Sequence, residues 1–99
     1  MNLRILDQAA AEFEAAIARY ENIESGLGVR FKQDVQTAAP WIGDHPELPR
    51  VRPNGFRRVN LKVFPYYIAY TILAGTIWVL AIAHGARRPE YWIDRGIPR

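Results

Sequence analysis

The fold of this chain is decided by residues 64–92, which read FPYYIAYTILAGTIWVLAIAHGARRPEYW. Residues 66–73 and 76–84 form two apolar runs rich in the β-branched and aromatic residues that favour strands. Only Ala74-Gly75 separates the runs, and a two-residue connection of this kind joins strands in a tight hairpin. The stretch therefore predicts a β-hairpin that ends in a basic and aromatic tail.

The second strand of this hairpin is apolar on both faces. Its two alternating sets of side chains are Val79, Ala81 and Ala83 on one face and Trp78, Leu80, Ile82 and His84 on the other. Because successive side chains of a strand point to opposite sides of a sheet, both sides need cover, as in the centre of a sheet. Helices on one side leave the other side for a second protein or for the chain's own C-terminal turn.

The N-terminal residues predict a short strand followed by a helix. Residues 2–6 alternate apolar and polar positions, and Asp7 is a residue type that caps helices. From Gln8 onward the apolar residues recur every three or four positions, which is the pattern of an amphipathic helix. We expect this helix to stop at Ser25-Gly26, because glycine adopts the left-handed conformation that closes many helices.

A second amphipathic helix is predicted from Leu27 to Ile42, with Ser25 as its cap. Pro40 lies inside this pattern and lacks a backbone N–H, so we expect a kink or an early end there. Two helices joined by so short a connection form an antiparallel hairpin, whose apolar side needs a sheet to pack against.

A third strand is predicted at residues 56–64, where two sets of side chains alternate. Val59, Leu61 and Val63 form its apolar face, and Arg58, Asn60 and Lys62 form its polar face. The chain is thus expected to be a single α+β domain of residues 1–99 with the element order β-α-α-β-β-β. The expected architecture is a small antiparallel β-sheet packed by an N-terminal helical hairpin, with a short C-terminal turn or helix around residues 91–95.

Composition excludes several classes of protein. The 99 residues, of which 49% are hydrophobic, suffice for one core but leave little room for a cofactor cavity of several hundred Å³. The chain has no cysteine and only two distant histidines, His45 and His84, so we expect neither a metal nor a cofactor. No stretch reaches the roughly 18 apolar residues of a membrane-spanning helix, so we expect no membrane contact. The absence of cysteine leads us to expect a protein of the reducing cytoplasm.

Charge divides the chain into two unlike halves. Residues 1–49 hold four Lys/Arg and eight Asp/Glu, a net −4, whereas residues 50–99 hold nine and two, a net +7. Eleven of the thirteen basic residues are arginine, whose planar fork binds carboxylate or phosphate through two hydrogen bonds. The C-terminal half therefore predicts a basic surface for an acidic protein partner or a nucleic-acid backbone, with a merely solvated basic face as the alternative.

Three segments follow one another in an order that is specific when they are taken together. They are the helix junction Gly26-Leu27-Gly28 with Phe31, the step Phe64-Pro65-Tyr66 with Ile68 and Tyr70, and residues 81–89 (AIAHGARRP) before Tyr91-Trp92. In these segments the chain resembles the ParE/RelE superfamily of toxins from bacterial type II toxin-antitoxin systems. The resemblance covers nearly the whole chain and is nearer to the ParE branch than to the ribosome-dependent RelE ribonucleases.

The resemblance implies a toxin of a plasmid-stabilisation system that stops growth by binding DNA gyrase. It also implies a cognate ParD-like antitoxin, whose acidic segment folds on the basic half of the toxin to form a hetero-oligomer. The residues expected to contact the target or the antitoxin are Arg57, Arg58, Lys62, Trp78, Arg87, Arg88, Tyr91 and Trp92. Arginine next to aromatic side chains, as in residues 87–92, is typical of interaction hot spots.

Two other functions stay open. A RelE-type member would cut mRNA on the ribosome, which needs an acid or a base and cations for the phosphate charge. The candidates for that chemistry are His84, Tyr91 and Arg87. The remaining alternative is a non-toxic family member that acts only as a protein-binding module. Because acid-base residues are few, we expect binding in place of catalysis.

Some of these residues also have a purely structural interpretation. His84, at the end of a strand, is a residue type that often forms a structural hydrogen bond in a partly buried position. Charged side chains such as Arg58 and Lys62 on an edge strand prevent sheets from aggregating edge to edge. The sequence leaves both interpretations open.

Overall fold

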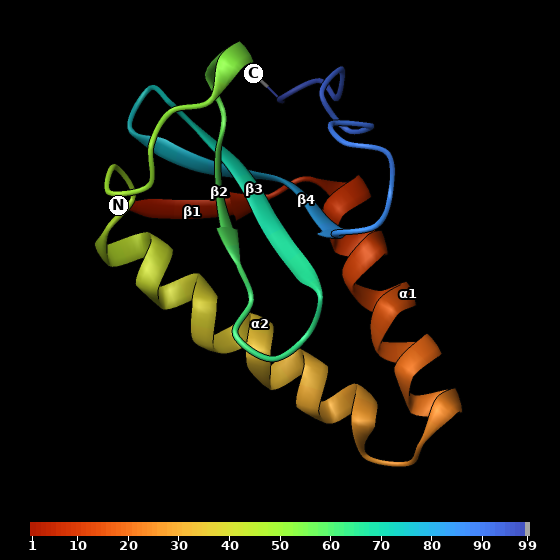
Figure 1. Cartoon of the computed structure of the whole chain (residues 1–99). Coiled ribbons are helices and arrows are strands. Elements are labelled where there is room, and N and C mark those ends of the chain that lie inside the picture. The colour runs from red at the N-terminus through yellow and green to blue at the C-terminus, as the bar shows by residue number, and fades with distance from the viewer. Residues whose placement is uncertain (99) are drawn as a thin grey trace.

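The computed structural model describes residues 1–98, and its elements follow the expected order β-α-α-β-β-β (Figure 1). They are β1 (Asn2–Ile5), α1 (Asp7–Ile23), α2 (Leu27–Asp44), the 3-10 turn η1 (Pro53–Gly55), β2 (Arg57–Asn60), β3 (Tyr66–Leu73) and β4 (Thr76–His84). The α+β class and the helical hairpin packed on a small sheet are confirmed. No helix within residues 1–98 is long and apolar enough to cross a membrane.

The four strands form one sheet in the order β1-β4-β3-β2. The hairpin strands β3 and β4 pair antiparallel through the turn at Ala74-Gly75, and β2 pairs antiparallel with β3. β1 joins the other edge of β4 in the parallel direction, from Asn2 opposite Thr76 to Ile5 opposite Val79. The sheet is therefore mixed and not purely antiparallel. Parallel strands need a long connection between them, and the two helices that follow β1 provide one.

A register shift in the hairpin changes which side chains share a face of β4. Ala69 pairs with Ala81 and Tyr70 pairs with Val79, so Leu80 is an extra residue in β4. The strict alternation expected along this strand is therefore broken at Leu80. Trp78, which pairs with Thr71, lies on the opposite face from Ile82, which pairs with Ile68.

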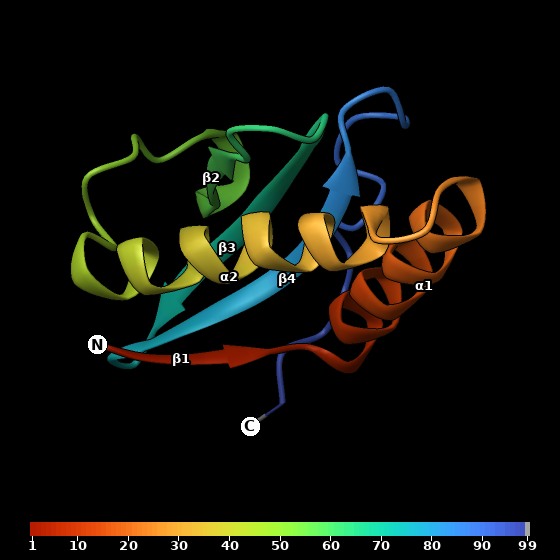
Figure 2. The ribbon, with the colours of Figure 1, turned by 90° about the horizontal axis from the view of Figure 1, so that it is seen from below.

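The helical hairpin covers one face of the sheet, as Figure 2 shows from below. An aromatic cluster forms the contact: the ring of Phe31 on α2 lies 4.8 Å from that of Tyr66 and 5.3 Å from those of Phe64 and Tyr20. Ring centroids at 4.5–7 Å in tilted or edge-on arrangements stabilise a core beyond the area that they bury. This cluster holds α1 and α2 against the start of β3, where Tyr66 lies.

The chain's own C-terminal segment covers the opposite face. Trp92 is 1% exposed, its ring meets that of Phe56 edge-on at 4.7 Å, and its Nε1–H donates to the hydroxyl of Tyr67 at 3.0 Å. Turns closed by hydrogen bonds at Glu90 and Trp92 confirm the expected turn in residues 91–95. Trp92 is thus a core residue, and the expectation that it belongs to an exposed binding surface is wrong.

The two helix starts differ from the expected caps. Asp7 is the first residue of α1, which is preceded by Leu6 with no side-chain cap. α2 begins after Gly26 in the left-handed conformation (φ 90°), with no bond from Ser25. Instead, the carboxylate of Glu21 accepts the N–H groups of Gly26 and Gly28 at 2.9 and 3.1 Å. A side chain of the preceding helix therefore satisfies the amides that a cap residue would bind.

Pro40 does not end α2, which continues to Asp44, so the expected early end is wrong. Proline removes the hydrogen bond that its own nitrogen would donate, and its ring crowds the carbonyl of the preceding turn. The turn beyond it is held by Ile42, which is fully buried, and by the N-terminal ammonium of Met1, which donates to the carbonyl of Gly43 at 3.3 Å. Burial of the last turn outweighs the missing bond.

The third strand is shorter than expected. β2 ends at Asn60, and residues 61–64 bend back toward α2, where the carboxylate of Asp34 accepts the N–H groups of Val63 and Phe64, both at 3.0 Å. Val63 is consequently 68% exposed and does not continue the apolar face of the strand. A long-range side-chain contact replaces the strand pairing that the alternation predicted.

Candidate functional site

A cavity of about 210 Å³ lies between α1, the end of β4 and the C-terminal segment. The polar and aromatic residues that line it are Glu12, Arg19, Tyr66, His84, Arg87 and Tyr91. Glu12 and Arg19 come from α1, Tyr66 from the start of β3, His84 from the end of β4, and Arg87 and Tyr91 from the segment after it. The cavity brings together His84, Arg87 and Tyr91, the three candidates that the sequence offered for chemistry.

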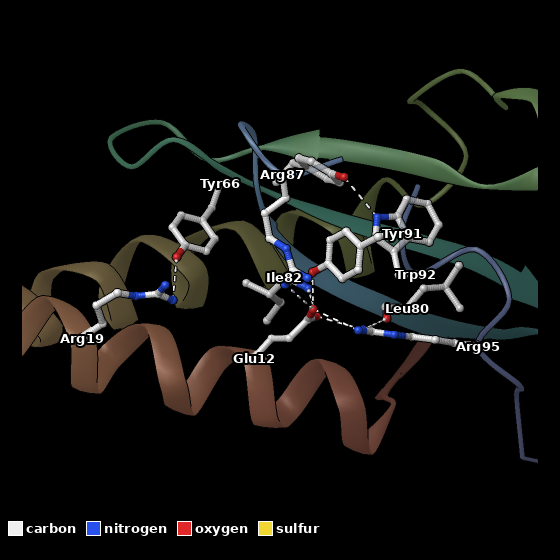
Figure 3. Close-up of polar contacts among 10 residues, drawn as sticks. Glu12, Arg19, Tyr66, Leu80, Ile82, Arg87, Tyr91, Trp92 and Arg95 are labelled. Atoms are coloured by element: carbon white, nitrogen blue, oxygen red, sulfur yellow. Dashed lines mark hydrogen bonds and ion pairs between the residues drawn. The ribbon is translucent and has the colours of Figure 1, made fainter. Parts of the chain in front are cut away.

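Glu12 is the centre of the polar contacts around this cavity (Figure 3). Its carboxylate accepts two hydrogen bonds from Arg95, at 2.9 and 3.0 Å, and one from the N–H of Ile82 at 3.2 Å. The hydroxyl of Tyr91 donates to the same carboxylate. With 15% of its side chain exposed, Glu12 is thus a partly buried anion whose charge is balanced by a guanidinium.

These contacts change the acidity of two groups. Burial, followed by the hydrogen bond to Glu12, raises the pKa of Tyr91 to about 12. The hydrogen bond to Glu12 also raises the pKa of Arg95, which therefore stays charged. A phenol that already donates to a carboxylate and has a raised pKa is a poor proton donor near neutral pH.

His84 is also committed to a structural contact. Its Nδ1 accepts the N–H of Ala86 at 2.9 Å, which places the ring proton of the neutral form on Nε2. Its ring meets that of Tyr66 edge-on at 5.1 Å. The hydroxyl of Tyr66 in turn accepts a hydrogen bond from Arg19 at 3.3 Å. His84 thus makes a structural hydrogen bond of the kind that its place at a strand end suggested.

Two guanidinium groups give the cavity a positive balance. Arg87 lies 3.8 Å above the ring of Tyr91 and 4.0 Å from the Glu12 carboxylate, which Arg95 already neutralises. Arg19 has no carboxylate within ion-pair distance among residues 1–98. The arrangement is therefore equipped to bind an anion, whereas its acid-base groups are held in structural hydrogen bonds. Residues 1–98 contain no cluster of three His, Asp or Glu side chains that could hold a metal ion.

Comparison with known proteins assigns the fold and the family. The sequence model of the family described as "ParE toxin of type II toxin-antitoxin system, parDE" matches residues 3–89. The chain belongs to this family. A solved structure described as "Chromosomal ParDE TA system from P. aeruginosa" has a similar fold, with a TM-score of 0.66 and 19% identity, over 85% of this chain and 95% of that chain. No curated protein sequence matches the chain.

The match to the ParE family ends at Pro89, just before the residues that close the cavity. Tyr91 and Arg95 bind Glu12, and Trp92 covers the sheet, so all three contributions come from the segment beyond the match. The side chains that contact Glu12 from this segment therefore lie outside the matched region.

The other expected binding residues lie apart from this cavity. Arg57 donates to the carbonyls of Glu47 and Pro49 at 2.8 and 2.7 Å, so it holds the loop after α2. Arg58 lies 3.8 Å above the ring of Tyr67 and donates to Asn60 at 2.9 Å. Lys62 is exposed and lines a second cavity, of about 310 Å³, between α2 and β2. These three cations therefore lie in three different local environments.

Trp78 and Arg88 complete the expected set. Trp78 is half-buried on the face of the sheet away from the helices, with the guanidinium of Arg4 5.9 Å from its ring. Arg88 is exposed in the segment after β4. Of the expected binding residues, Arg87, Arg88 and Lys62 thus present their charges to solvent, while Arg57 and Trp92 serve the fold.

Sequence reasoning missed Glu12, Arg19, Tyr66 and Arg95 as site residues. Glu12 and Arg19 look like ordinary polar positions of an amphipathic helix, and nothing in their local sequence distinguishes them. One signal was present: the first strand is much shorter than the last one, so part of the edge of a central strand needs other partners. Glu12 and Arg95 supply them.

Proposed function

We propose that this ParE family member is the growth-inhibiting toxin of a type II toxin-antitoxin pair, and that it acts by binding DNA gyrase in the cytoplasm. The observation that carries the preference for binding over catalysis is the state of the acid-base groups. The Tyr91 hydroxyl donates to Glu12, and Nδ1 of His84 accepts from a backbone amide. Neither is poised to move a proton to or from an RNA substrate.

The partner in this proposal is a ParD-like antitoxin with an acidic segment. Support comes from charge, because the half of the chain after residue 49 carries a net +7. Arg87, Arg88 and Lys62 are exposed in that half. An acidic segment that folds on this surface would neutralise the toxin in a hetero-oligomer and leave gyrase free.

A gyrase assay tests the target. Induced expression is expected to stop bacterial growth, and the purified chain is expected to inhibit supercoiling and trap gyrase on broken DNA. Co-expression with a ParD-like antitoxin that binds the chain should restore growth. Cleavage of translated messages with no effect on gyrase would overturn the proposal in favour of a RelE-type ribonuclease, for which the joint placement of His84, Arg87 and Tyr91 is the supporting observation.

A further inference from the structure

The edge of β4 is only half covered by a strand. β1 ends at Ile5, opposite Val79, while β4 continues from Leu80 to His84. Beyond the end of β1, side chains take the place of a strand: Arg95 donates to the carbonyl of Leu80 at 3.0 Å. Glu12 accepts the N–H of Ile82 on the same edge.

The next backbone groups along this edge face the cavity. In a strand, N–H and C=O groups point to the same edge at every second residue. Because the N–H of Ile82 points toward α1, the carbonyl of Ile82 and the N–H of His84 belong to the same edge. Both residues line the cavity together with Arg19 and Arg87. The cavity therefore combines a strand edge with two guanidinium groups.

The chemistry of the cavity favours a carboxylate over a nucleotide. Recognition of single-stranded nucleic acid uses open aromatic faces on which bases stack. Here the ring of Tyr91 is covered by Arg87, and Tyr66 is 6% exposed and packed among other rings. The volume of about 210 Å³ is also smaller than that of a typical ligand pocket. These features suit one acidic side chain of an extended peptide.

We propose that this cavity is a carboxylate-binding site for an acidic peptide segment that extends the sheet along the edge of β4 beyond β1. The peptide backbone pairs with Ile82 and His84, and an Asp or Glu side chain enters between Arg19 and Arg87, whose forked donors bind carboxylate through two hydrogen bonds. Figure 3 shows the guanidinium of Arg19, from α1, at the hydroxyl of Tyr66 and that of Arg87, from the segment after β4, beside Glu12. The proposal rests on the proposed function only for the source of the segment, the antitoxin.

Synthetic peptides test the site on the full chain. Two peptides of equal length alternate valine with glutamate or with glutamine, and amide chemical shifts of the isotope-labelled chain report binding. The glutamate peptide is expected to shift Ile82, Ala83 and His84 and to bind about tenfold more tightly than the glutamine peptide. Arg19→Gln and Arg87→Gln should each lower its affinity about tenfold, and Arg30→Gln, at an exposed position of α2 outside the cavity, should not.

Three outcomes would overturn the proposal. The first is equal binding of the two peptides, and the second is a set of shifts on β2 in place of the end of β4. The third is inorganic phosphate binding more tightly than the glutamate peptide, which would make the cavity a phosphate site. Amide spectra of each variant establish that it is folded, and Arg87→Lys, which keeps the charge but loses the fork, gives an intermediate affinity. None of these outcomes changes the result expected in the gyrase assay, so either proposal can be overturned without the other.

Discussion

Glu12 and Arg95 lie 83 positions apart in the sequence and form a two-point ion pair, with hydrogen bonds of 2.9 and 3.0 Å and only 15% and 18% of their side chains exposed. The pair joins the first helix to the C-terminal segment. It also satisfies the edge of β4 where β1 has ended, through Ile82 and Leu80. One carboxylate thus links the helix, the sheet and the segment that covers it.

Removal of this carboxylate is expected to destabilise the fold. Glu12→Ala leaves Arg95 without its counter-ion and the N–H of Ile82 and the hydroxyl of Tyr91 without their acceptor. We expect the free energy of unfolding to fall by about 2–4 kcal/mol, measured by urea denaturation. Glu14→Ala, an exposed position of the same helix, should change it by less than about 0.5 kcal/mol. Equal losses for the two variants would contradict the role of Glu12.

The raised pKa of Tyr91 predicts a loss of stability at alkaline pH. In the unfolded chain the phenol ionises near pH 10, whereas burial and Glu12 raise its pKa to about 12 in the folded chain. The stabilisation is therefore complete below about pH 10 and is lost as the pH rises toward 12, because the unfolded state then binds fewer protons. The free energy of unfolding of Tyr91→Phe should fall less steeply over this range.

A spectrophotometric titration of the phenols checks the same prediction. Burial also raises the pKa values of Tyr20 and Tyr70, so the difference between the wild-type chain and Tyr91→Phe isolates the contribution of Tyr91. A difference curve with its midpoint near pH 10 would show that the phenol does not donate to Glu12 in solution.

Trp92 is expected to be essential for the cover of the second face of the sheet. Trp92→Ala removes a fully buried ring from its contact with Phe56 and should lower the free energy of unfolding by about 3–5 kcal/mol. Trp92→Phe keeps most of the ring but loses the donor to Tyr67, so a loss of about 1 kcal/mol is expected. The control Trp41→Ala removes an indole that is 38% exposed. A loss for Trp41→Ala as large as that for Trp92→Ala would contradict the assignment of Trp92 to the core.

The elements that the sequence predicted well are those determined by short-range patterns. The hairpin of β3 and β4 follows from two apolar runs and a two-residue turn, and the two helices follow from their apolar spacing. The direction of β1 was not predictable in this way, because alternation specifies the faces of a strand but not the direction of its partner. The extra residue at Leu80 was not predictable either, because its neighbours in the run are also apolar.

The candidate site was predictable only in part, for a similar reason. His84, Arg87 and Tyr91 are close together in the sequence, so the sequence of this segment was enough to identify them as candidates for the cavity that they line. Arg19 and Glu12 reach the same cavity from α1, and their contribution depends on how the helix packs along β4. Tertiary contacts also give different roles to residues that look alike in the sequence. Of two adjacent arginines, Arg57 binds backbone carbonyls and Arg58 lies on an aromatic ring.

Arg57 and Arg88 should separate an effect on folding from an effect on the target. Arg57→Ala removes two hydrogen bonds of 2.8 and 2.7 Å to the loop after α2, so we expect the free energy of unfolding to fall by about 1–3 kcal/mol. Arg88 is exposed, so Arg88→Ala should leave stability unchanged within about 0.5 kcal/mol while weakening gyrase inhibition by the purified chain. Arg57→Ala, assayed at a temperature where it is folded, should inhibit gyrase as the wild-type chain does. The reverse pattern, with inhibition lost in folded Arg57→Ala and kept in Arg88→Ala, would move the gyrase-binding surface from the segment after β4 to β2.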